Sequence, residues 1–182
     1  MIGTLDWVPA LLRLDLLAPR VAEALGTWPH ASEVHVAQID PHVADTAALA
    51  EAHGVPLDVS ANCVVVAGKR EGEQRVAACL VLATTRADVN GLVRRTLQVR
   101  KASFLPMDDA VERTSMEYGG ITPVGLPDGW PLLVDGAVAA APVVVIGSGV
   151  RRSKLAMPGR FAAQLPGAQV IPDLGMPTGP AG

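Results

Sequence analysis

Aromatic side chains are scarce in this sequence, and cysteine occurs only at Cys63 and Cys79. Phe, Trp and Tyr together account for 3% of the residues, so the core must consist of Val, Leu and Ala, and a surface that stacks many nucleotide bases is excluded. Both cysteines lie in apolar runs without His or Cys neighbours at ligand spacing. They therefore predict small buried side chains in a reducing compartment, and no zinc site.

Charge and long apolar segments are limited as well. Charged residues make up 18% of the chain and its net charge is −3, which argues against a broad nucleic-acid-coating surface but leaves room for a local basic patch. No apolar run has the length of a membrane span, and the N-terminus lacks a signal-peptide pattern. We expect a soluble cytoplasmic protein that binds neither membrane nor DNA. The scattered histidines and the lack of a nucleotide-binding glycine motif predict no metal and no organic cofactor.

The 182 residues suffice for one domain with a sizeable core. Helices are predicted at 7–25 (interrupted by Pro19), 46–53, 88–97, 106–116 and 158–165. Strands are predicted at 34–39, 63–67, 75–83, 102–105, 132–135, 143–146, 153–157 and 170–171, with a longer hairpin loop at 68–74. This order of elements indicates an α/β layer fold with a mixed sheet.

Residues 117–127, which we call the glycine loop, hold three glycines and two prolines. The adjacent Gly119 and Gly120 allow close approach to the backbone, while Pro123 restricts Thr122 to an extended conformation. Amide groups of such a stiff loop can converge on a carbonyl oxygen or an oxyanion. On composition alone, a plain connection between a helix and a strand is the simpler interpretation.

The run Gly119-Gly120-Ile121-Thr122-Pro123-Val124-Gly125 resembles the Gly-Gly-x-Ser/Thr-Pro-x-Gly loop of the YbaK/prolyl-tRNA-editing (INS-like) family of aminoacyl-tRNA deacylases. The resemblance runs in order from about Asp45 to about Leu165. It implies a single domain with a mixed sheet surrounded by helices, and hydrolysis of an aminoacyl ester on tRNA without a cofactor. We expect this domain over residues 1–174, with 1–44 partly a family-variable addition, and a flexible tail at 175–182.

The resemblance also implies site residues. Backbone groups of Gly119, Gly120 and Ile121 would hold the ester, with Thr122 and Pro123 beside it. At Asn62 the family usually has the lysine most tied to deacylation, and asparagine cannot bring a positive charge there. Either Asn62 orients water or substrate by hydrogen bonding, or activity is weakened, altered or lost. A third interpretation is that Asn62 merely opens a strand.

Polar residues after two later strands complete the predicted site. Asp135 ends one strand, where the family often carries an aspartate, and we expect it to shape the pocket. Gly147, Ser148 and Gly149 follow the next strand, a favoured place for ligand contact in α/β folds. The basic residues that come next are candidate contacts for the acceptor end of tRNA, although a solvated turn explains them equally well: Arg151, Arg152 and Lys154.

The leading hypothesis is a stand-alone editing domain that removes a small mischarged amino acid, such as Cys, Ala or Ser, from tRNA in trans. Its partners would be the tRNA acceptor end and an aminoacyl-tRNA synthetase. The rival hypothesis is a non-catalytic homologue that binds tRNA, a synthetase or a small ligand. A third hypothesis is an esterase for another small acyl ester. If the first holds, Gly119–Pro123, Asn62, Asp135 and Ser148 should line one cleft.

Overall fold

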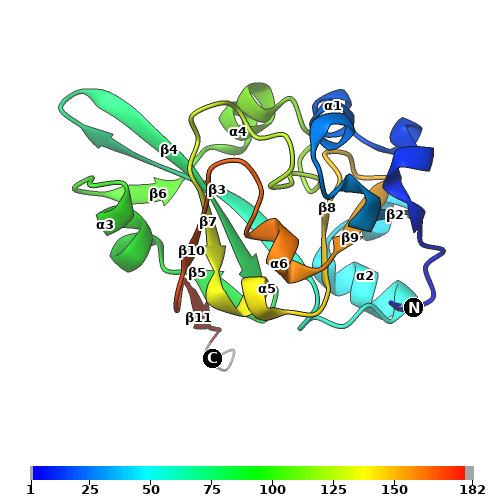
Figure 1. Ribbon diagram of the computed structural model, residues 1–182. Helices are drawn as coiled ribbons and strands as arrows, with labels where there is room; N and C mark the ends of the chain where they lie inside the picture. The colour runs from blue at the N-terminus through cyan, green and yellow to red at the C-terminus, as the bar shows by residue number, and fades with distance from the viewer. Residues whose placement is uncertain (1, 179–182) are drawn as a thin grey trace.

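The computed structural model describes residues 2–178, which form two main β-sheets with helices around them (Figure 1). The strands are β1 (Val8–Pro9), β2 (His35–Gln38), β3 (Ala61–Arg70), β4 (Glu73–Leu82), β5 (Thr85–Ala87), β6 (Ala102–Phe104), β7 (Leu132–Asp135), β8 (Val144–Gly147), β9 (Ser153–Met157), β10 (Ala168–Ile171) and β11 (Gly175–Pro177). One sheet has the order β1-β2-β9-β8 and the other the order β10-β7-β4-β3-β6. Parallel pairing of β7 with β4 and β10 makes the second sheet mixed, which confirms the predicted fold class.

The helices are α1 (Pro19–Thr27), α2 (Thr46–His53), α3 (Arg94–Thr96), α4 (Met107–Thr114), α5 (Gly136–Ala140) and α6 (Gly159–Ala162). Helix α2 has the predicted ends, because the Asp45 carboxylate accepts a hydrogen bond from the Ala48 N–H at 2.8 Å and Gly54 closes the helix in the left-handed region. No helix among residues 2–178 is long and apolar enough to cross a membrane.

Several predicted elements differ from the structure. Pro19 begins α1 instead of interrupting a longer helix, because a proline at the first helical position loses no hydrogen bond. The predicted helix at 88–97 opens as a π-helical turn, Val89–Val93, which the Asp88 carboxylate caps. The flexible tail predicted from Gly175 is wrong for its first three residues, since β11 pairs with β5, while residues 179–182 lie outside the described part of the chain.

The hairpin of β3 and β4 is longer and tighter than the sequence predicts (Figure 1). Its ladder runs from Ala61 opposite Leu82 to Arg70 opposite Glu73, so the strands continue through most of the polar segment predicted as a loop. The turn uses positive φ at both central residues, Glu71 (54°) and Gly72 (87°). Such a turn matches the twist of the strands, but it requires a glutamate in a region that non-glycine residues rarely adopt.

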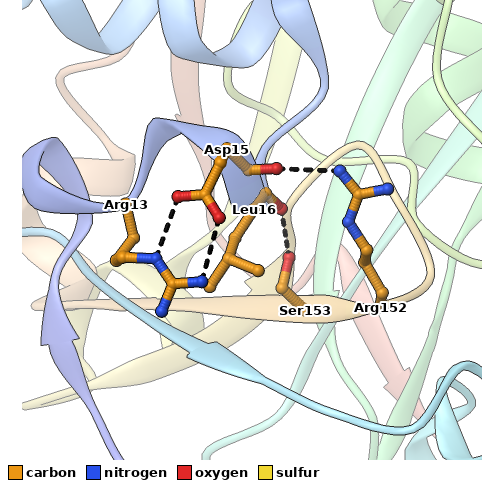
Figure 2. A network of polar contacts seen from close by, with 5 residues as sticks. All are labelled: Arg13, Asp15, Leu16, Arg152 and Ser153. Carbon is orange, nitrogen blue, oxygen red and sulfur yellow. Dashed lines mark hydrogen bonds and ion pairs between the residues drawn. The ribbon is translucent and has the colours of Figure 1, made fainter.

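The N-terminal segment is an integral part of the four-stranded sheet. Strand β2 pairs with β9 and β1 pairs with β2, so residues before the predicted domain core extend the sheet. Arg152 donates a hydrogen bond to the Asp15 carbonyl oxygen at 2.8 Å, and the Ser153 hydroxyl donates to the Leu16 carbonyl oxygen at 2.5 Å (Figure 2). These bonds attach the turns before α1 to the start of β9.

The two sheets meet where β3 begins beside β8. Ser60 forms a parallel bridge with Val145, and the Val145 N–H donates to the Val59 carbonyl oxygen at 2.7 Å. Leu49 of α2 packs in one apolar cluster with Val145 of β8 and Ala156 of β9, so α2 covers this junction. Helix α2 and strands β3, β8 and β9, which are far apart in the sequence, therefore lie around one junction between the two sheets.

Candidate functional site

A cavity of about 430 Å³ lies where α2, β3, β8 and β9 meet. Its lining includes Asn62, Gly119, Ile121 and Gly147 from the predicted site, together with Lys154 from the predicted basic patch. The other lining residues are mostly small or aliphatic: Ala44, Asp45, Thr46, Leu49, Ser60, Ala61, Cys63, Val64, Tyr118, Val145 and Ile146. The structure thus brings position 62 and the glycine loop to the same cavity.

A larger groove of about 930 Å³ lies against other residues of the glycine loop, between α1 and the segment Leu165–Gln169. Of the predicted site residues within 2–178, only Pro123 lines it. Its arginine, Arg20, is already bound to the glycine loop, donating to the carbonyl oxygens of Gly125 at 2.8 Å and Leu126 at 3.5 Å. We take the smaller cavity as the candidate site, because several polar groups converge there on an apolar pocket.

Asn62 is the second residue of β3, and its side chain bridges this strand to α2. The Asn62 side-chain oxygen accepts a hydrogen bond of 2.9 Å from the Thr46 hydroxyl. Within residues 2–178 the side-chain NH₂ group has no acceptor, so it remains available to a water molecule or a substrate oxygen in the cavity. The position therefore offers neutral hydrogen-bond donors and no charge.

Two residues of the glycine loop, Gly119 and Ile121, line the cavity. Gly119 adopts φ +78°, and the N–H groups of Gly119 and Ile121 have no hydrogen-bond acceptor in the described part of the chain. The Gly120 N–H differs from the prediction, because it donates to the Glu117 carbonyl oxygen at 2.9 Å and so closes the turn. Gly119 and Ile121, rather than Gly120, supply the free amides of this loop.

Close packing of backbone on backbone explains two further glycines. A Cβ atom at Gly120 would lie 2.7 Å from the backbone of Val150, and one at Gly147 would lie 2.6 Å from the Ile121 carbonyl oxygen. The Gly149 N–H also donates to the Gly120 carbonyl oxygen at 2.7 Å. The turn after β8 therefore presses against the glycine loop and holds it rigid.

Arg151 fastens the glycine loop to the chain before α2. Its guanidinium donates to the carbonyl oxygens of Tyr118 at 3.2 Å and Pro41 at 2.9 Å, and its backbone N–H donates to the Glu117 carboxylate at 2.7 Å. Three bonds from one residue fix the entrance of the loop. Arg151 is half-buried, and its guanidinium is bound to the backbone and is not a free surface cation.

Lys154 lies in the cavity instead of on the surface. It is the second residue of β9, where it pairs with Gly147 on one side and Ala37 on the other, and only 8% of the residue is exposed. Burial and the nearby charge of Arg151 lower the pKa of its ammonium to about 8, although the negative charge of Asp45 raises that pKa and partly offsets them. Arg152 alone of the three basic residues is exposed, so the predicted patch does not exist as one surface.

Cys63 also lines the cavity, on the strand position after Asn62. Burial raises the pKa of its thiol far above the ordinary value, with a smaller contribution from Cys79. A thiol that stays protonated is a poor nucleophile, so Cys63 serves as a small apolar wall.

Asp135 does not line this cavity. It ends β7 in the five-stranded sheet, 3% exposed, and a Cβ atom at Gly175 would lie 2.9 Å from its carboxylate. The prediction placed Asp135 beside the turn after β8, but β8 belongs to the other sheet. The sequence order of two strands says nothing about which sheet each one joins, and the expected cleft is wrong at this residue.

Ser148 and Thr122 are also outside the cavity, because both are fully buried. The Ser148 hydroxyl lies 2.7 Å from the Ser153 hydroxyl and 3.1 Å from the Val150 carbonyl oxygen, so it stabilises the turn between β8 and β9. The Thr122 hydroxyl has no hydrogen-bond partner within residues 2–178. Gly149 packs against α1 through Ala18 and Val21 and makes the turn possible at φ +84°.

Sequence reasoning missed most residues of the cavity lining, among them Asp45, Thr46 and Tyr118. Thr46 was predicted only as the first residue of a helix, Asp45 only as a residue near the start of that helix and of the family resemblance, and Tyr118 only as part of the glycine loop, where the residue is 58% exposed. Lys154 was read as part of a basic run, although it lies inside a predicted strand. The local pattern does not show that both faces of this strand are buried.

Comparison with known families decides which class this cavity belongs to. The profile described as "Aminoacyl-tRNA editing domain" matches residues 40–162. The chain belongs to the YbaK-type aminoacyl-tRNA editing domain family. The match contains every residue that lines the cavity, from Ala44 to Lys154, whereas β1, α1 and β2 precede it.

Solved structures agree with the editing-domain fold. A structure described as a candidate trans-editing enzyme for prolyl-tRNA synthetase has a TM-score of 0.72 at 23% identity, covering 85% of this chain and 94% of that one. A scaffold protein used for epitope grafting gives 0.72 at 23% identity, covering 85% and 95%. A hypothetical protein gives 0.70 at 21% identity, with the same coverage. None of the curated proteins compared with this editing domain matches it.

Proposed function

We propose that this protein hydrolyses the ester bond between tRNA and a small mischarged amino acid, acting in trans in the cytoplasm. The observation that carries the proposal is that Asn62 lines one cavity together with Gly119 and Ile121, two residues of the glycine loop whose N–H groups have no acceptor within residues 2–178. Membership of the editing-domain family supports the reaction class. The trans mode is supported by the description of one fold neighbour, and a misacylating synthetase would supply the substrate.

An aminoacyl ester is already reactive, so its hydrolysis needs positioning more than strong acid or base chemistry. The N–H groups of Gly119 and Ile121 would stabilise the negative charge that develops on the carbonyl oxygen during attack by water. The NH₂ group of Asn62 would hold the attacking water or the ester oxygen in place. Arg151 would act indirectly, because it holds the glycine loop in the required shape.

The walls of the cavity favour a small side chain. Leu49, Ala61, Val64 and Val145 form an apolar surface in this cavity. Methyl, hydroxymethyl and thiomethyl groups, the side chains of Ala, Ser and Cys, suit such a surface. The exposed ring of Tyr118 lies at the same cavity and offers a stacking surface for the terminal base of the acceptor end.

The test is a deacylation screen with alanyl-, seryl-, cysteinyl- and threonyl-tRNA, measured as loss of the acylated species over time. We expect at least one of these esters to be hydrolysed well above the spontaneous rate, and Asn62→Ala to slow it. Asn90→Ala is the matched control, because Asn90 lies in the π-helical turn Val89–Val93 and does not line the cavity. Spontaneous rates throughout the panel would rule the proposal out.

The neutral side chain at position 62 favours a second candidate, a non-catalytic protein that holds an aminoacyl-tRNA without cleaving it. Slow dissociation of a labelled aminoacyl-tRNA, with its ester intact, would support that function. A panel of simple aminoacyl esters distinguishes these two candidates from a general esterase, because only the esterase would cleave such esters in the absence of tRNA.

A further inference from the structure

The cavity contains a cation that the proposed roles of Asn62 and the glycine loop leave unused. Lys154 projects from the face of β9 that also carries Ala156, which packs with Leu49 of α2. Its cross-strand neighbour, Gly147, has no side chain and lies directly under the glycine loop. Lys154 and Asn62 therefore line the same cavity, which Gly147 of β8 and the start of α2 also border.

The surroundings of this ammonium do not neutralise it. The titratable or charged groups that face it are Asp45 before α2, Arg151 in the turn before β9 and Cys63 of β3, whose thiol stays protonated. Asp45 is exposed and uses one carboxylate oxygen to cap α2, and Lys154 makes no ion pair or hydrogen bond with any residue in the range 2–178. A buried charge without a partner is costly to the fold, which is typical of a group retained for function.

We propose that Lys154 is a catalytic residue that holds the ester carbonyl of the bound aminoacyl-tRNA and stabilises its oxyanion, so that β9 supplies the cation that β3 lacks at Asn62. This inference rests on the proposed hydrolysis. Lys69, the other lysine close to Asn62 in sequence, lies exposed near the tip of the β3–β4 hairpin and does not line the cavity.

The reaction balances without another reactant. The oxygen of a water molecule forms a bond to the carbonyl carbon, and the carbonyl electron pair moves to the oxygen that faces the Lys154 ammonium and the N–H groups of Gly119 and Ile121. When this electron pair returns, the bond between the carbonyl carbon and the ribose oxygen breaks. The ribose oxygen takes one proton that came from the water, and the products are the free amino acid and uncharged tRNA. Lys154 keeps its proton throughout.

The experiment compares Lys154→Met with Lys69→Met on the best substrate of the deacylation screen. Removal of one oxyanion donor typically costs about 10²–10³-fold in kcat, so we expect a loss of this size for Lys154→Met and no change for Lys69→Met. Methionine fills the space of the lysine stem and removes an unpaired buried charge. The variant should therefore melt at the same temperature as the wild type or higher, which separates loss of catalysis from loss of folding.

A second arm uses readouts that a structural role would not change. In the wild type, kcat should fall as the pH rises through about 8, because the ammonium loses its proton, and Lys154→Arg should move this fall to higher pH. In the Lys154→Met background, Asn62→Lys should raise kcat at least tenfold, because the new lysine places an ammonium in the cavity from β3. An active wild type whose Lys154→Met variant keeps its rate overturns this inference alone. A wild type without activity on any substrate overturns the proposed function and this inference with it.

Discussion

Substitution of Gly119 by alanine is the sharpest test of the glycine loop. Gly119 adopts φ +78°, and a non-glycine residue in this region costs roughly 1–2 kcal/mol. A Cβ atom there would overlap Nη1 of Arg151, which donates to the Tyr118 carbonyl oxygen, and a shift of the guanidinium would also disturb the bond from Nη2 to the Pro41 carbonyl oxygen. Hydrogen bonds from a charged group contribute about 1.5–3 kcal/mol each, so the loop entrance should shift. Displacement of one backbone donor then predicts a loss of kcat on the order of 10²-fold.

Gly72→Ala provides the control for backbone strain. Gly72 has φ +87° in the β3–β4 turn, and a Cβ atom there meets nothing within 4 Å. Both variants carry the same strain, which for a chain of this size lowers Tm by about 2–4 °C per kcal/mol. The assay is single-turnover deacylation beside thermal unfolding of both proteins. If Gly119→Ala melts earlier but keeps kcat within threefold of Gly72→Ala, the loop is not the oxyanion site.

Three further predictions concern the surface and the buried charge. Tyr118→Ala should raise KM about tenfold by removing a stacking surface, while Phe104→Ala, with a ring that is also exposed but lies on β6, should not. Arg152→Ala should reduce the slope of log Kd against log salt for tRNA by about 0.7–0.9, as expected for one lost phosphate contact, and Arg86→Ala, an exposed arginine on β5, should leave it unchanged. The pKa of Lys154 is lowered in the folded state, so between about pH 8 and 10.5 the native protein binds fewer protons than the unfolded chain, and its stability should increase as the pH rises through this range. Chemical unfolding should show that the free energy of unfolding of the wild type gains roughly 3 kcal/mol relative to that of Lys154→Met over this range. Parallel curves of stability against pH for the two proteins would contradict this prediction.

The sequence predicts the local elements of this fold well wherever the signal is local. Asp45 and Gly54 mark the ends of α2, and the strands at 132–135 and 153–157 match β7 and β9 in full. The β3–β4 turn escaped prediction because Glu71 adopts a conformation that its residue type disfavours, and the length of the paired strands overrides that preference. The glycine loop was recognised because its glycines and prolines leave few backbone conformations open.

The composition of the cavity depends on contacts that no local pattern contains. Asp135 and Gly147 both end predicted strands, yet β7 and β8 belong to different sheets, and only the contact between Ser60 and Val145 shows which of them lies beside Asn62. Lys154 was grouped with Arg151 and Arg152 because they are neighbours in sequence. Lys154 lies within β9 and lines the cavity, whereas Arg152 precedes the strand and is exposed, and this difference comes from the packed sheet and not from the basic run.

The same geometry gives the sign of a substitution that the sequence alone leaves open. Asn62→Lys in the wild type does not simply add a missing group, because it places a second ammonium in the cavity that already holds Lys154, with Arg151 also nearby. Like charges lower each other's pKa, and the new lysine would lose the hydrogen bond that the Asn62 oxygen accepts from Thr46. We therefore expect Asn62→Lys alone to lower kcat or leave it unchanged at neutral pH, and to raise it only when Lys154 is methionine. Titration of kcat from pH 6 to 9 for the two single variants and the double variant measures this coupling. A gain from Asn62→Lys of equal size in both backgrounds would show that the two positions act independently, and that the cation on β9 does not serve the site on β3.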